Sequence, residues 1–581
     1  MPRIAVIEKD KCNPIKCGDY LCIRLCPVNR RGDECIFQGE DKKAGINEKL
    51  CNGCGICQNR CPFKAIHIIN LPSELEIPLH RFGKNGFSLY NLPIPKKGKV
   101  TGILGKNGIG KTTAIKILAR LLVPNLGKNA SYLNIIEFFR GTELQSYFQN
   151  LKDKKIKISY KPQKIDEIPK QYSGKVIDLL KKVDEKNQLE NIIKELQLDK
   201  ILDNNISTLS GGELQRVAIA AASLKKADIF IFDELTSYLD IKQRLNIAKF
   251  IHSLANENTS ILIVEHDLIA LDYITDFIHI MYGQPACYGI VSQIKTNKSG
   301  INTYLEGYLK EENVRFRDKQ IKFEKKSQIK KKKENILNSW PFLNKKLDSF
   351  NLEVEPGEIN RKEIIGILGE NAIGKTTFVK ILAGLLKPDE GEINTKIKVS
   401  YKPQYLDATS DELVADILKK AIQEYKKQII HPLNIDQLLT RKISELSGGE
   451  LQRVAIALCL SQEYDLALLD EPSAYLDVEQ RLAVSKVIKN IMEERGTSAL
   501  VVDHDLLFLD YLSDRLLVFS GIPAKHGIAK GPFSMENGMN SLLKKINITL
   551  RREEINGRPR INKLDSVKDS EQKKANKYYY V

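Results

Sequence analysis

The chain of 581 residues is too long for one hydrophobic core, and at roughly 150 residues per domain it predicts about four domains. Its composition, with 42% hydrophobic and 28% charged residues, is typical of globular domains and excludes wholesale disorder, collagen and a disulfide-stabilised miniprotein. The formal net charge of +17 suits a polyanionic partner, and it is also what a lysine-rich proteome would produce.

No stretch approaches the roughly 20 consecutive apolar residues that a membrane helix needs. The densest runs, 229–232 and 261–264, have the length of buried strands. Residues 1–12 are rich in charge and lack the apolar segment of a secretory signal. We therefore expect a cytoplasmic protein that does not enter a membrane.

The first region with a chemical signature is rich in cysteine. Nine of the 11 cysteines lie within the first 61 residues, which favours metal ligation over disulfides in a chain without an export signal. The run Cys51-x2-Cys54-x2-Cys57-x3-Cys61-Pro62 has the bacterial ferredoxin spacing, in which three thiolates bind one [4Fe–4S] cluster and the fourth binds a second cluster. The earlier run, Cys12-x4-Cys17-x4-Cys22-x3-Cys26-Pro27, keeps the final spacing but widens the first two gaps.

In two-cluster ferredoxins the fourth cysteine of each run binds the cluster of the other run. This rule assigns Cys12, Cys17, Cys22 and Cys61 to one cluster and Cys26, Cys51, Cys54 and Cys57 to the other. Cys35 is then left over, and Cys287 and Cys459 are expected in the core. Two structural zinc sites are the alternative, although zinc modules rarely contain two four-cysteine runs that end in Cys-Pro. Because no flavin or haem motif follows, a structural role for the clusters is favoured over electron transfer.

A repeat begins with two phosphate-binding motifs. Apolar strands are predicted at 100–105 and 364–369, and each leads into Gly-x4-Gly-Lys-Thr and a helical pattern. Glycines let backbone N–H groups close on phosphates at a helix N-terminus, the lysine reaches the β- and γ-phosphates, and the threonine binds Mg²⁺. The predicted ATP-binding residues are Gly105, Lys106, Asn107, Gly108, Ile109, Gly110, Lys111, Thr112 and Thr113 in the first copy, and Gly369, Glu370, Asn371, Ala372, Ile373, Gly374, Lys375, Thr376 and Thr377 in the second.

The repeat continues with Tyr-Lys-Pro-Gln, which ends at Gln163 and Gln404, and with Leu-Ser-Gly-Gly-Glu-Leu-Gln-Arg. In the latter, Ser and Glu make the capping box of a helix, and the glycines allow a phosphate close to the helix N–H groups. Each copy therefore has a second predicted anion site, formed by Ser210, Gly211, Gly212 and Glu213 or by Ser447, Gly448, Gly449 and Glu450.

Acidic residues end the next strands. Apolar runs at 229–233 and 466–470 finish in Asp233-Glu234 and Asp470-Glu471, Tyr-Leu-Asp then ends at Asp240 and Asp477, and a last strand leads to His266 or His504. Because a parallel sheet binds ligands at the carboxyl ends of its strands, we predict that each Asp helps to bind Mg²⁺ and that each Glu positions or deprotonates water.

The two copies differ in length. Lys375 follows Lys111 by 264 residues but Gln404 follows Gln163 by only 241, so the first copy has 23 extra residues, in which apolar spacing predicts two short amphipathic helices around Gly141. Two other segments, 308–335 and 541–581, each contain 11 basic and 5 acidic residues. They are either solvated helical faces or contacts with nucleic-acid phosphates.

The P-loop, Gln, Leu-Ser-Gly-Gly-Glu, Asp-Glu and His in this order resemble the ATP-binding-cassette (ABC) superfamily over residues 80–525. With the cysteine domain, essentially the whole chain resembles its subfamily E, the RNase L inhibitor family. The resemblance implies an α/β fold with an N-terminal ferredoxin-like domain that holds two [4Fe–4S] clusters, and two P-loop nucleotide-binding domains arranged head to tail with hinge segments. The implied domains are 1–75 (iron–sulfur), 76–294 (first cassette, with a helix–loop–helix insert at 130–153), 295–335 (hinge 1), 336–524 (second cassette) and 525–581 (hinge 2 and basic tail).

The resemblance also implies residue roles. Each ATP would lie between one P-loop and the Leu-Ser-Gly-Gly-Glu of the other copy, with Glu234 and Glu471 as catalytic bases and His266 and His504 on the γ-phosphate. Gln163 and Gln404 would sense that phosphate and help to bind Mg²⁺. In the first site Thr112 and Asp233 would bind the same ion, and in the second site Thr376 and Asp470 would do so. Asp240 and Asp477 would link the sites. Phe82 and Phe87 would stack on adenine, or simply pack in the core. Leu235-Thr236 in place of Pro472-Ser473, and Ala372 in place of Gly108, would make the sites unequal in rate.

The function implied by the resemblance is ATP-driven splitting of post-termination or stalled ribosomes, through closure of the cassettes and movement of the iron–sulfur domain, with a later role in initiation on the small subunit. The implied partners are the small subunit and its rRNA, a class-1 release factor or Pelota-like factor, and initiation factors, and the chain would act as a monomer that pairs its own cassettes. The alternatives are an ATP-gated electron-transfer protein and the ATPase subunit of a membrane transporter.

Overall fold

A computed structural model describes the chain except for residues 1–2, 71–76, 324–334, 348, 394–396, 405–408, 564–565 and 580–581. The described residues form two compact units, the first comprising 1–235, 251–265 and 275–318 and the second 236–250, 266–274 and 319–581. The predicted boundary at 75/76, most of the basic part of hinge 1 and the last two residues lie outside the described residues.

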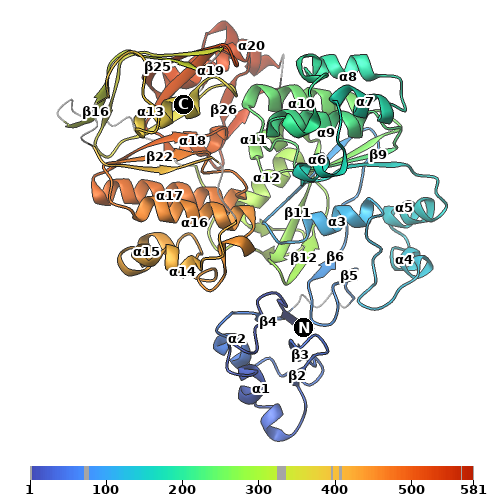
Figure 1. The fold of residues 1–581 in the computed structure, drawn as a ribbon. Helices are drawn as coiled ribbons and strands as arrows, with labels where there is room; N and C mark the ends of the chain where they lie inside the picture. Colours follow the sequence, from blue (N-terminus) through green and yellow to red (C-terminus); the bar gives the residue numbers. More distant parts are fainter. Residues whose placement is uncertain are drawn as a thin grey trace. The chain divides into compact units, whose positions relative to one another are not determined.

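The N-terminal domain of the first unit is built from short paired elements (Figure 1). β1 (Arg3–Ile7) pairs antiparallel with β4 (Ile66–Asn70), and β2 (Ile36–Gln38) pairs with β3 (Ala44–Ile46). α1 (Leu21–Leu25) contacts α2 (Ile56–Arg60), and a Cys-Pro pair follows each helix. Apolar side chains that include Ile7, Ile46 and Ile66 form its core together with the cysteines. This two-fold pattern is the predicted ferredoxin-like arrangement.

The first cassette contains a nine-stranded sheet. Its strand order is β5 (His80–Arg81), β6 (Ser88–Tyr90), β12 (Tyr288–Val291), β11 (Phe277–Gln284), β7 (Val100–Gly105), β10 (Ser260–Val264), β9 (Ile229–Asp233) and β8 (Ile158–Lys161), and β13 (Lys295–Thr296) also pairs with β11. β7, β8, β9, β10 and β11 are parallel. β7, β9 and β10 are buried along their whole length, which explains their continuous apolar sequences.

Helices flank this sheet (Figure 1). Those of the first unit are α3 (Lys111–Leu118), α4 (Tyr132–Phe138), α5 (Glu143–Lys152), α6 (Ile168–Gln171), α7 (Val176–Val183), α8 (Leu189–Glu195), α9 (Gly211–Ser223) and α12 (Asn297–Glu306). α10 (Ile241–Leu254) is shared by the two units, and α11 (Leu268–Ile274) belongs to the second. The two helices predicted in the insert are confirmed as α4 and α5, which contact each other and stack Phe139 on Phe148 with ring centroids 5.2 Å apart.

The second cassette repeats the design with an eight-stranded sheet in the order β17 (Leu343–Leu347), β18 (Phe350–Val354), β25 (His526–Ser534), β24 (Arg515–Ile522), β20 (Ile364–Leu368), β23 (Ser498–Val502), β22 (Leu466–Asp470) and β21 (Val399–Lys402). β16 (Ile336–Trp340) and β19 (Gly357–Asn360) form a separate pair. The helices are α13 (Lys375–Leu382), α14 (Val414–Ile417), α15 (Lys419–Glu424), a π-helix (Lys426–Ile430), α16 (Gly448–Ser461), α17 (Val478–Arg495), α18 (Leu506–Leu512), α19 (Met535–Lys545) and α20 (Val567–Lys574). No helix among the described residues is long and apolar enough to cross a membrane.

Each of the two basic segments contains a short hairpin among its described residues. The first contains a short hairpin, β14 (Tyr308–Leu309) with β15 (Val314–Arg315), and the second contains the hairpin of β26 (Leu550–Arg552) with β27 (Pro559–Ile561). In the second hairpin Arg552, Arg558 and Arg560 are at most 13% exposed and form ion pairs with carboxylates. The charge count did not indicate these internal ion pairs, and contact of the other basic residues with nucleic-acid phosphates stays a prediction.

A buried histidine in β11 gives the first cassette a pH dependence. His279 Nδ1 donates to the carbonyl of Ser292 over 2.8 Å, its Nε2 accepts the N–H of Ile94 over 3.0 Å, and burial lowers its pKa to about 4. A folded-state pKa below the unfolded value of about 6.5 means that His279 stabilises the fold above pH 6.5 and that this contribution is lost as the pH falls toward 4. We expect a loss of about 3 kcal/mol.

The melting temperatures of the protein and of the His279→Asn variant at pH 7.5 and pH 5 check this prediction. The unchanged protein should lose more stability between the two values than the variant, since asparagine does not titrate. Equal losses would contradict it.

Candidate nucleotide and iron–sulfur sites

The first P-loop connects β7 to α3 and encloses its own lysine. Gly110 has a φ of 95° and caps α3, a backbone conformation that favours glycine. Lys111 is 7% exposed, and its Nζ donates to the carbonyl oxygens of Gly105 (2.8 Å) and Lys106 (2.7 Å). The ammonium group is thus held inside the loop at a helix N-terminus, where an anion is favoured.

The second P-loop has the same geometry with one unusual residue. Lys375 Nζ donates to the carbonyls of Gly369 (2.9 Å) and Glu370 (2.7 Å), and burial lowers the pKa of Lys375 to about 8 although neighbouring carboxylates oppose the shift. Ala372 has a φ of 54°, where its counterpart is Gly108. A left-handed alanine costs about 1 kcal/mol relative to glycine, so the second loop is the more strained of the two.

Each motif threonine lies beside the aspartate of its own copy. Thr112 Oγ1 is 3.4 Å from Asp233 Oδ2, and Thr376 Oγ1 donates to Asp470 Oδ2 over 2.8 Å. Burial raises the pKa of Asp233 to about 6 and also raises that of Asp470. A hydroxyl and a carboxylate are oxygen donors of the kind that Mg²⁺ takes, and a divalent cation would favour the ionised carboxylates that burial disfavours. The donor set therefore fits Mg²⁺, which when bound would compensate the phosphate charge.

The glutamates that follow these aspartates occupy strained backbone positions. Glu234 has a φ of 55° and Glu471 a φ of 48°, and their N–H groups donate to the ends of the neighbouring strands, at Val264 (2.9 Å) and Val502 (2.8 Å). Gln163 Nε2 donates to Glu234 Oε1 over 2.5 Å, and Gln404 Nε2 donates to Glu471 Oε1 over 2.8 Å. Burial raises the pKa of Glu471 to about 7, which suits a general base near neutral pH.

Two side chains that the sequence analysis quoted but gave no role hold this turn in the first copy. Lys161 Nζ donates to the carbonyls of Asp233 (3.0 Å) and Glu234 (2.7 Å), and Gln215 Nε2 donates to those of Glu234 (2.7 Å) and Leu235 (2.9 Å). In the second copy, the equivalent Lys402 and Gln452 donate to the carbonyl of Glu471. Both positions are identical in the two copies of the repeat, which is the signal that could have identified them.

Replacing Lys161 by Met is expected to lower kcat of the first site about tenfold with little change in KM, because the strained turn loses two hydrogen bonds and the carboxylate shifts. The variant is compared in a Glu471→Gln background, in which the first site turns over alone. Lys164→Met, an exposed lysine three residues further on, is the control. An unchanged kcat in Lys161→Met would contradict a positioning role.

The histidines lie beyond the last strand of each copy. His504 is 8% exposed, its Nε2 has no hydrogen-bond partner among the described residues, and that atom is 3.6 Å from Glu471 Oε1. Burial lowers its pKa well below the ordinary value, so the ring is neutral. An orphaned ring nitrogen beside the Glu471 carboxylate suits an N–H donor to a phosphate oxygen. His266 is 9% exposed and directly precedes Asp267 and α11.

The Leu-Ser-Gly-Gly-Glu motifs open α9 and α16 with the predicted capping boxes. Ser210 Oγ donates to Glu213 Oε2 over 2.7 Å, and Ser447 Oγ donates to Glu450 Oε2 over 2.8 Å. The glycines between them form the first turn of each helix. Both motifs therefore present helix N–H groups, as an anion site requires.

Within the second unit, the Tyr-Leu-Asp segment of the first copy contacts the second P-loop. The backbone N–H of Asn371 donates to Asp240 Oδ2 over 3.0 Å, and the Asn371 side chain donates to the carbonyl of Tyr238 over 3.1 Å. Lys242 Nζ lies 3.2 Å from Glu370 Oε1. Asp477 caps α17 through the N–H of Gln480. The segment that follows one acidic pair is thus bonded to the phosphate loop of the other copy.

The structure separates the two predicted adenine-stacking residues. Phe87 is half-buried against the core of the first cassette, and its ring lies so close to Gly110 that a Cβ there would be 2.6 Å from it. Phe82 is 47% exposed, and its ring lies edge-on to His80 with centroids 4.6 Å apart. The packing of Phe87 explains why residue 110 is glycine. Stacking on adenine stays a prediction for both rings.

The predicted cluster cysteines lie close enough to influence one another, and their division into two ligand sets stays a prediction. Burial raises the pKa of Cys22 to about 11, with added effects from the thiols of Cys12, Cys17 and Cys61. Burial likewise raises the pKa of Cys57 to about 12, with contributions from Cys51, Cys22 and Cys54. Metal binding would have to displace these protons, since thiolate is the ligand form. Among the described residues, no three His, Cys, Asp or Glu side chains are placed to hold a single metal ion.

Cys35, which the spacing left over, lies beside two cysteines of the second predicted set. It is 1% exposed, and its thiol is within hydrogen-bonding reach of Cys26 and Cys51. Backbone N–H groups approach the sulfurs as well; the N–H of Ala65, for example, donates to Cys61 Sγ over 3.4 Å. Such bonds stabilise cluster thiolates, so the donor set and its surroundings fit iron–sulfur clusters. Cys287 and Cys459 are buried in the cassettes as expected.

Comparison with known proteins agrees with this geometry. The model of the ABC transporter family matches residues 92–237 and 351–474, that of the 4Fe-4S binding domain matches 44–67, and that described as "Possible Fer4-like domain in RNase L inhibitor, RLI" matches 2–34. An uncharacterized ABC transporter ATP-binding protein of Methanocaldococcus jannaschii is 53% identical, covering 100% of this chain and 98% of the relative. Translation initiation factor RLI1 of Saccharomyces cerevisiae is 45% identical, covering 100% and 98%.

Solved structures give the same result. ABCE1 from a model of ribosome-bound archaeal Pelota and ABCE1 is 53% identical with a TM-score of 0.95, covering 100% of this chain and 99% of that chain. The archaeal ribosome recycling factor aABCE1, in complex with the ribosomal stalk protein aP1, is 54% identical with a TM-score of 0.82, covering 87% and 99%.

These matches and the site geometry define the class of protein: a twin-cassette ABC ATPase that hydrolyses ATP and has a domain that binds 4Fe–4S clusters. Within that class, the chain belongs to the ABC transporter E family, the family of RNase L inhibitor.

Proposed function

We propose that this protein is a cytoplasmic ribosome recycling factor that splits post-termination or stalled ribosomes into subunits and afterwards acts on the small subunit in initiation. The observation that supports this most directly is full-length similarity, at a TM-score of 0.95, to an archaeal ABCE1 described together with ribosome-bound Pelota. The proposed partners are the small subunit and its rRNA, a release factor or Pelota-like factor, and initiation factors.

The proposed cycle uses two composite ATP sites. One joins the P-loop around Lys111 to Ser447–Gly449, and the other joins the P-loop around Lys375 to Ser210–Gly212. Because the γ-phosphate would bind groups of both cassettes, ATP would bind the closed arrangement preferentially and so shift the protein toward it. The bond between Asp240 and the N–H of Asn371 supports communication between one site and the loop of the other.

Hydrolysis would return the protein to the open arrangement. Glu234 and Glu471 would orient and deprotonate the attacking water, and a neutral His504 would donate its ring N–H to the γ-phosphate. The predicted ligand sets of the clusters are Cys12, Cys17, Cys22 and Cys61, and Cys26, Cys51, Cys54 and Cys57. The clusters would make the N-terminal domain rigid, so that its movement with the first cassette can separate the subunits.

The test is a sucrose-gradient profile of purified archaeal-type post-termination ribosomes with the protein, a release factor and ATP. We expect conversion of whole ribosomes into subunits only when all three are present. The Glu234→Gln/Glu471→Gln variant, run in parallel, should stay on the small subunit because it binds ATP without hydrolysing it. Intact ribosomes and no co-sedimenting protein, with ATPase activity retained, would overturn the proposal.

A further inference from the structure

A second pocket lies in the first cassette, at the edge of the sheet opposite the nucleotide site. It has a volume of about 550 Å³ and is lined by Lys155, Lys157, Lys186 and Lys226, with Asp228 among them. Lys157 directly precedes β8 and Asp228 directly precedes β9, so the pocket lies where these strands begin. The P-loop follows the carboxyl end of β7, and Asp233 and Glu234 lie at the carboxyl end of β9. The pocket is therefore separate from the ATP site.

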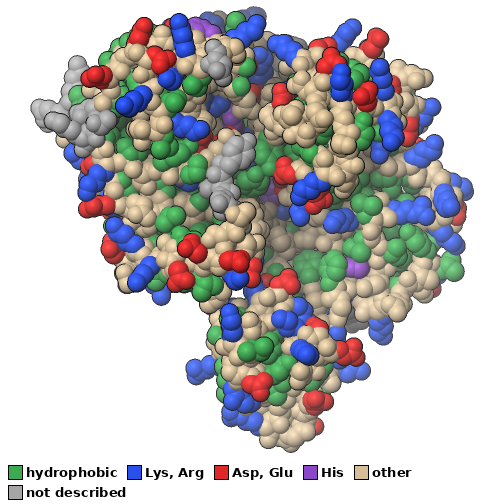
Figure 2. Space-filling model, in the orientation of Figure 1, with side chains coloured by type: hydrophobic (Ala, Val, Ile, Leu, Met, Phe, Trp, Pro, Cys, Tyr) green, Lys and Arg blue, Asp and Glu red, His purple; other side chains and the backbone are tan. Residues whose placement is uncertain are grey.

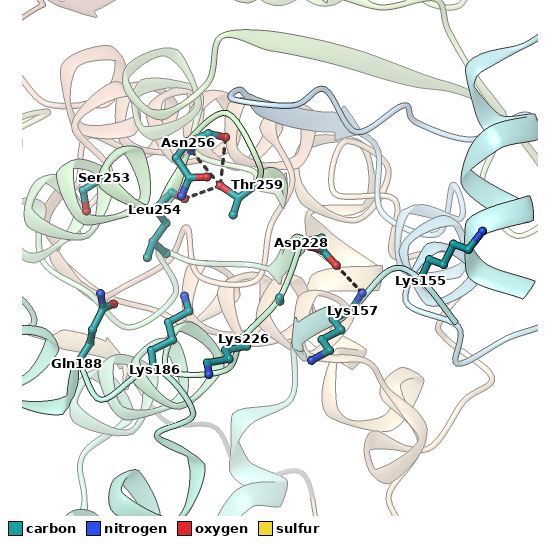
Figure 3. A pocket seen from close by; sticks show the side chains of 11 residues that line it. Lys155, Lys157, Lys186, Gln188, Lys226, Asp228, Ser253, Leu254, Asn256 and Thr259 are labelled. Carbon is teal, nitrogen blue, oxygen red and sulfur yellow. Dashed lines mark hydrogen bonds between the residues drawn. The ribbon is translucent and has the colours of Figure 1, made fainter. Parts of the chain in front are cut away.

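The pocket is lined by four lysines but by a single acidic residue, Asp228, so its lining carries a net positive charge. Figure 3 shows Lys186, Lys226 and Lys157 next to one another along the pocket. Lys186 Nζ donates to the carbonyl of Ser223 over 2.9 Å, and Lys155 Nζ is 3.4 Å from Asp153 Oδ2. The side chains of Lys157 and Lys226 form no ion pair with any residue in the described part of the chain.

The carboxylates near these two lysines bond the backbone instead of the ammonium groups. Asp228 Oδ2 accepts the N–H of Lys157 over 2.7 Å, and Glu185 Oε2 accepts the N–H of Lys226 over 2.9 Å. On the face shown in Figure 2, basic and acidic side chains are interspersed. In this pocket, by contrast, four lysines line one hollow.

The second cassette provides an internal comparison at the same place. Its Asp465 accepts the N–H of Lys398 over 3.0 Å, as Asp228 accepts that of Lys157 in the first cassette. The two residues before Asp465, however, are Glu463 and Tyr464, where the first cassette has Lys226 and Ala227. Glu463 pairs with Lys398 over 2.9 Å, and Tyr464 is 4% exposed beneath the guanidinium of Arg495, 4.5 Å from its ring centroid.

Folding therefore does not need the hollow or its charge, because the same loop in the second cassette is neutralised and filled. In the first cassette, two adjacent residues differ from those of the second cassette, and both differences favour an anion site. Lys226 stands where an acid would neutralise Lys157, and Ala227 stands where an aromatic ring would fill the space. Lys157 and Lys226 are exposed, and their like charges beside one hollow attract an anion, whose binding would stabilise the fold.

The lining indicates the class of anion. Ammonium groups bind phosphate as point charges, and amide and hydroxyl side chains, among them Asn256 and Thr259, supply neutral hydrogen bonds. No aromatic side chain lines the pocket, so it offers no surface on which a nucleic-acid base could stack. Its volume lies in the range of small-molecule sites. We propose that this pocket binds a small anion that carries two or more phosphate groups, independently of the ATP sites and of the ribosome.

Amine-reactive footprinting of the full-length protein with its clusters in place tests this proposal. The P-loops are filled with Mg²⁺ and ADP, inorganic tripolyphosphate is the probe, and acylation of each lysine is followed by mass spectrometry. We expect tripolyphosphate to slow acylation of Lys157 and Lys226 about tenfold, as is expected when an ammonium group enters a charge-assisted bond, and to leave Lys398 unchanged. Equal rates with and without the probe would overturn the proposal.

Two exchange variants provide the matched controls. Lys226→Glu/Ala227→Tyr gives the first cassette the residues of the second, and it should abolish the protection of Lys157 while ATP hydrolysis is retained. Glu463→Lys/Tyr464→Ala does the reverse, and it should make Lys398 newly protected by tripolyphosphate. Protection by a short RNA duplex but not by tripolyphosphate would instead assign the site to an RNA backbone and overturn the small-anion proposal, as would protection that persists in the first variant.

Discussion

Replacing both Glu234 and Glu471 by Gln is expected to lower the steady-state rate of ATP hydrolysis by about 100-fold or more, the usual contribution of a general base, while ATP binding is retained. Each carboxylate is at the end of a buried strand, and each accepts a hydrogen bond from a glutamine of its own copy, Gln163 or Gln404. Glutamine has the same shape as glutamate but cannot take a proton from water. The expected loss is therefore in kcat and not in nucleotide affinity.

Phosphate release at saturating ATP and binding of a fluorescent ATP analogue check this prediction separately. Glu190→Gln, an exposed glutamate at the start of α8, is the matched control and should behave like the unchanged protein. Each single variant should keep the turnover of its unaltered site. A double variant with more than about a tenth of the original rate would show that neither carboxylate is the base.

The sequence predicted most of what determines this site. Buried strands, P-loops and capped signature helices each follow from a local pattern, and the repeat doubles every such pattern. Lys161 and Gln215 received no role because their partners are backbone carbonyls, at Asp233 and Glu234. No pairing of residue types in the sequence points to a bond between a side chain and the backbone of a distant turn. Both residues are identical in the two copies of the repeat, and this identity is the feature of the sequence that could have indicated their role.

The partners of the arginines in the second hairpin could not be predicted from the sequence for a different physical reason. A count of charges contains no information about partners, so the arginines of 550–561 indicated either solvent or phosphates. Their partners are two equivalent aspartates of the repeat, Asp272 and Asp510, in the matching sequences Leu-Asp-Tyr. One hairpin therefore reaches the helix that follows the histidine in both copies, α11 through Asp272 and α18 through Asp510.

The second large effect is expected from the more deeply buried of these pairs. Asp272 accepts Arg560 Nε (2.6 Å) and Nη2 (2.8 Å), and its Oδ2 lies 3.2 Å from Nη2 of Arg558, whose side chain is 0% exposed. Asp272→Asn keeps the shape but leaves the buried guanidinium of Arg558 without its ion-pair partner. Loss of one partner of a buried pair costs about 3 to 5 kcal/mol. We expect the hairpin and α11 to lose that much stability.

Hydrogen exchange of the amides in 550–561 and 268–274 measures this loss as faster local opening. Asp510→Asn is the matched control: its partner Arg552 is 10% exposed whereas Arg558 is 0% exposed, so water reaches the freed charge of Arg552 more easily and the effect should be smaller. Asp272→Asn/Arg558→Met should recover most of the protection, because an apolar side chain replaces the stranded charge. Equal effects of the two single variants, or no recovery in the double variant, would mean that packing of the hairpin and not the ion pair holds it to α11.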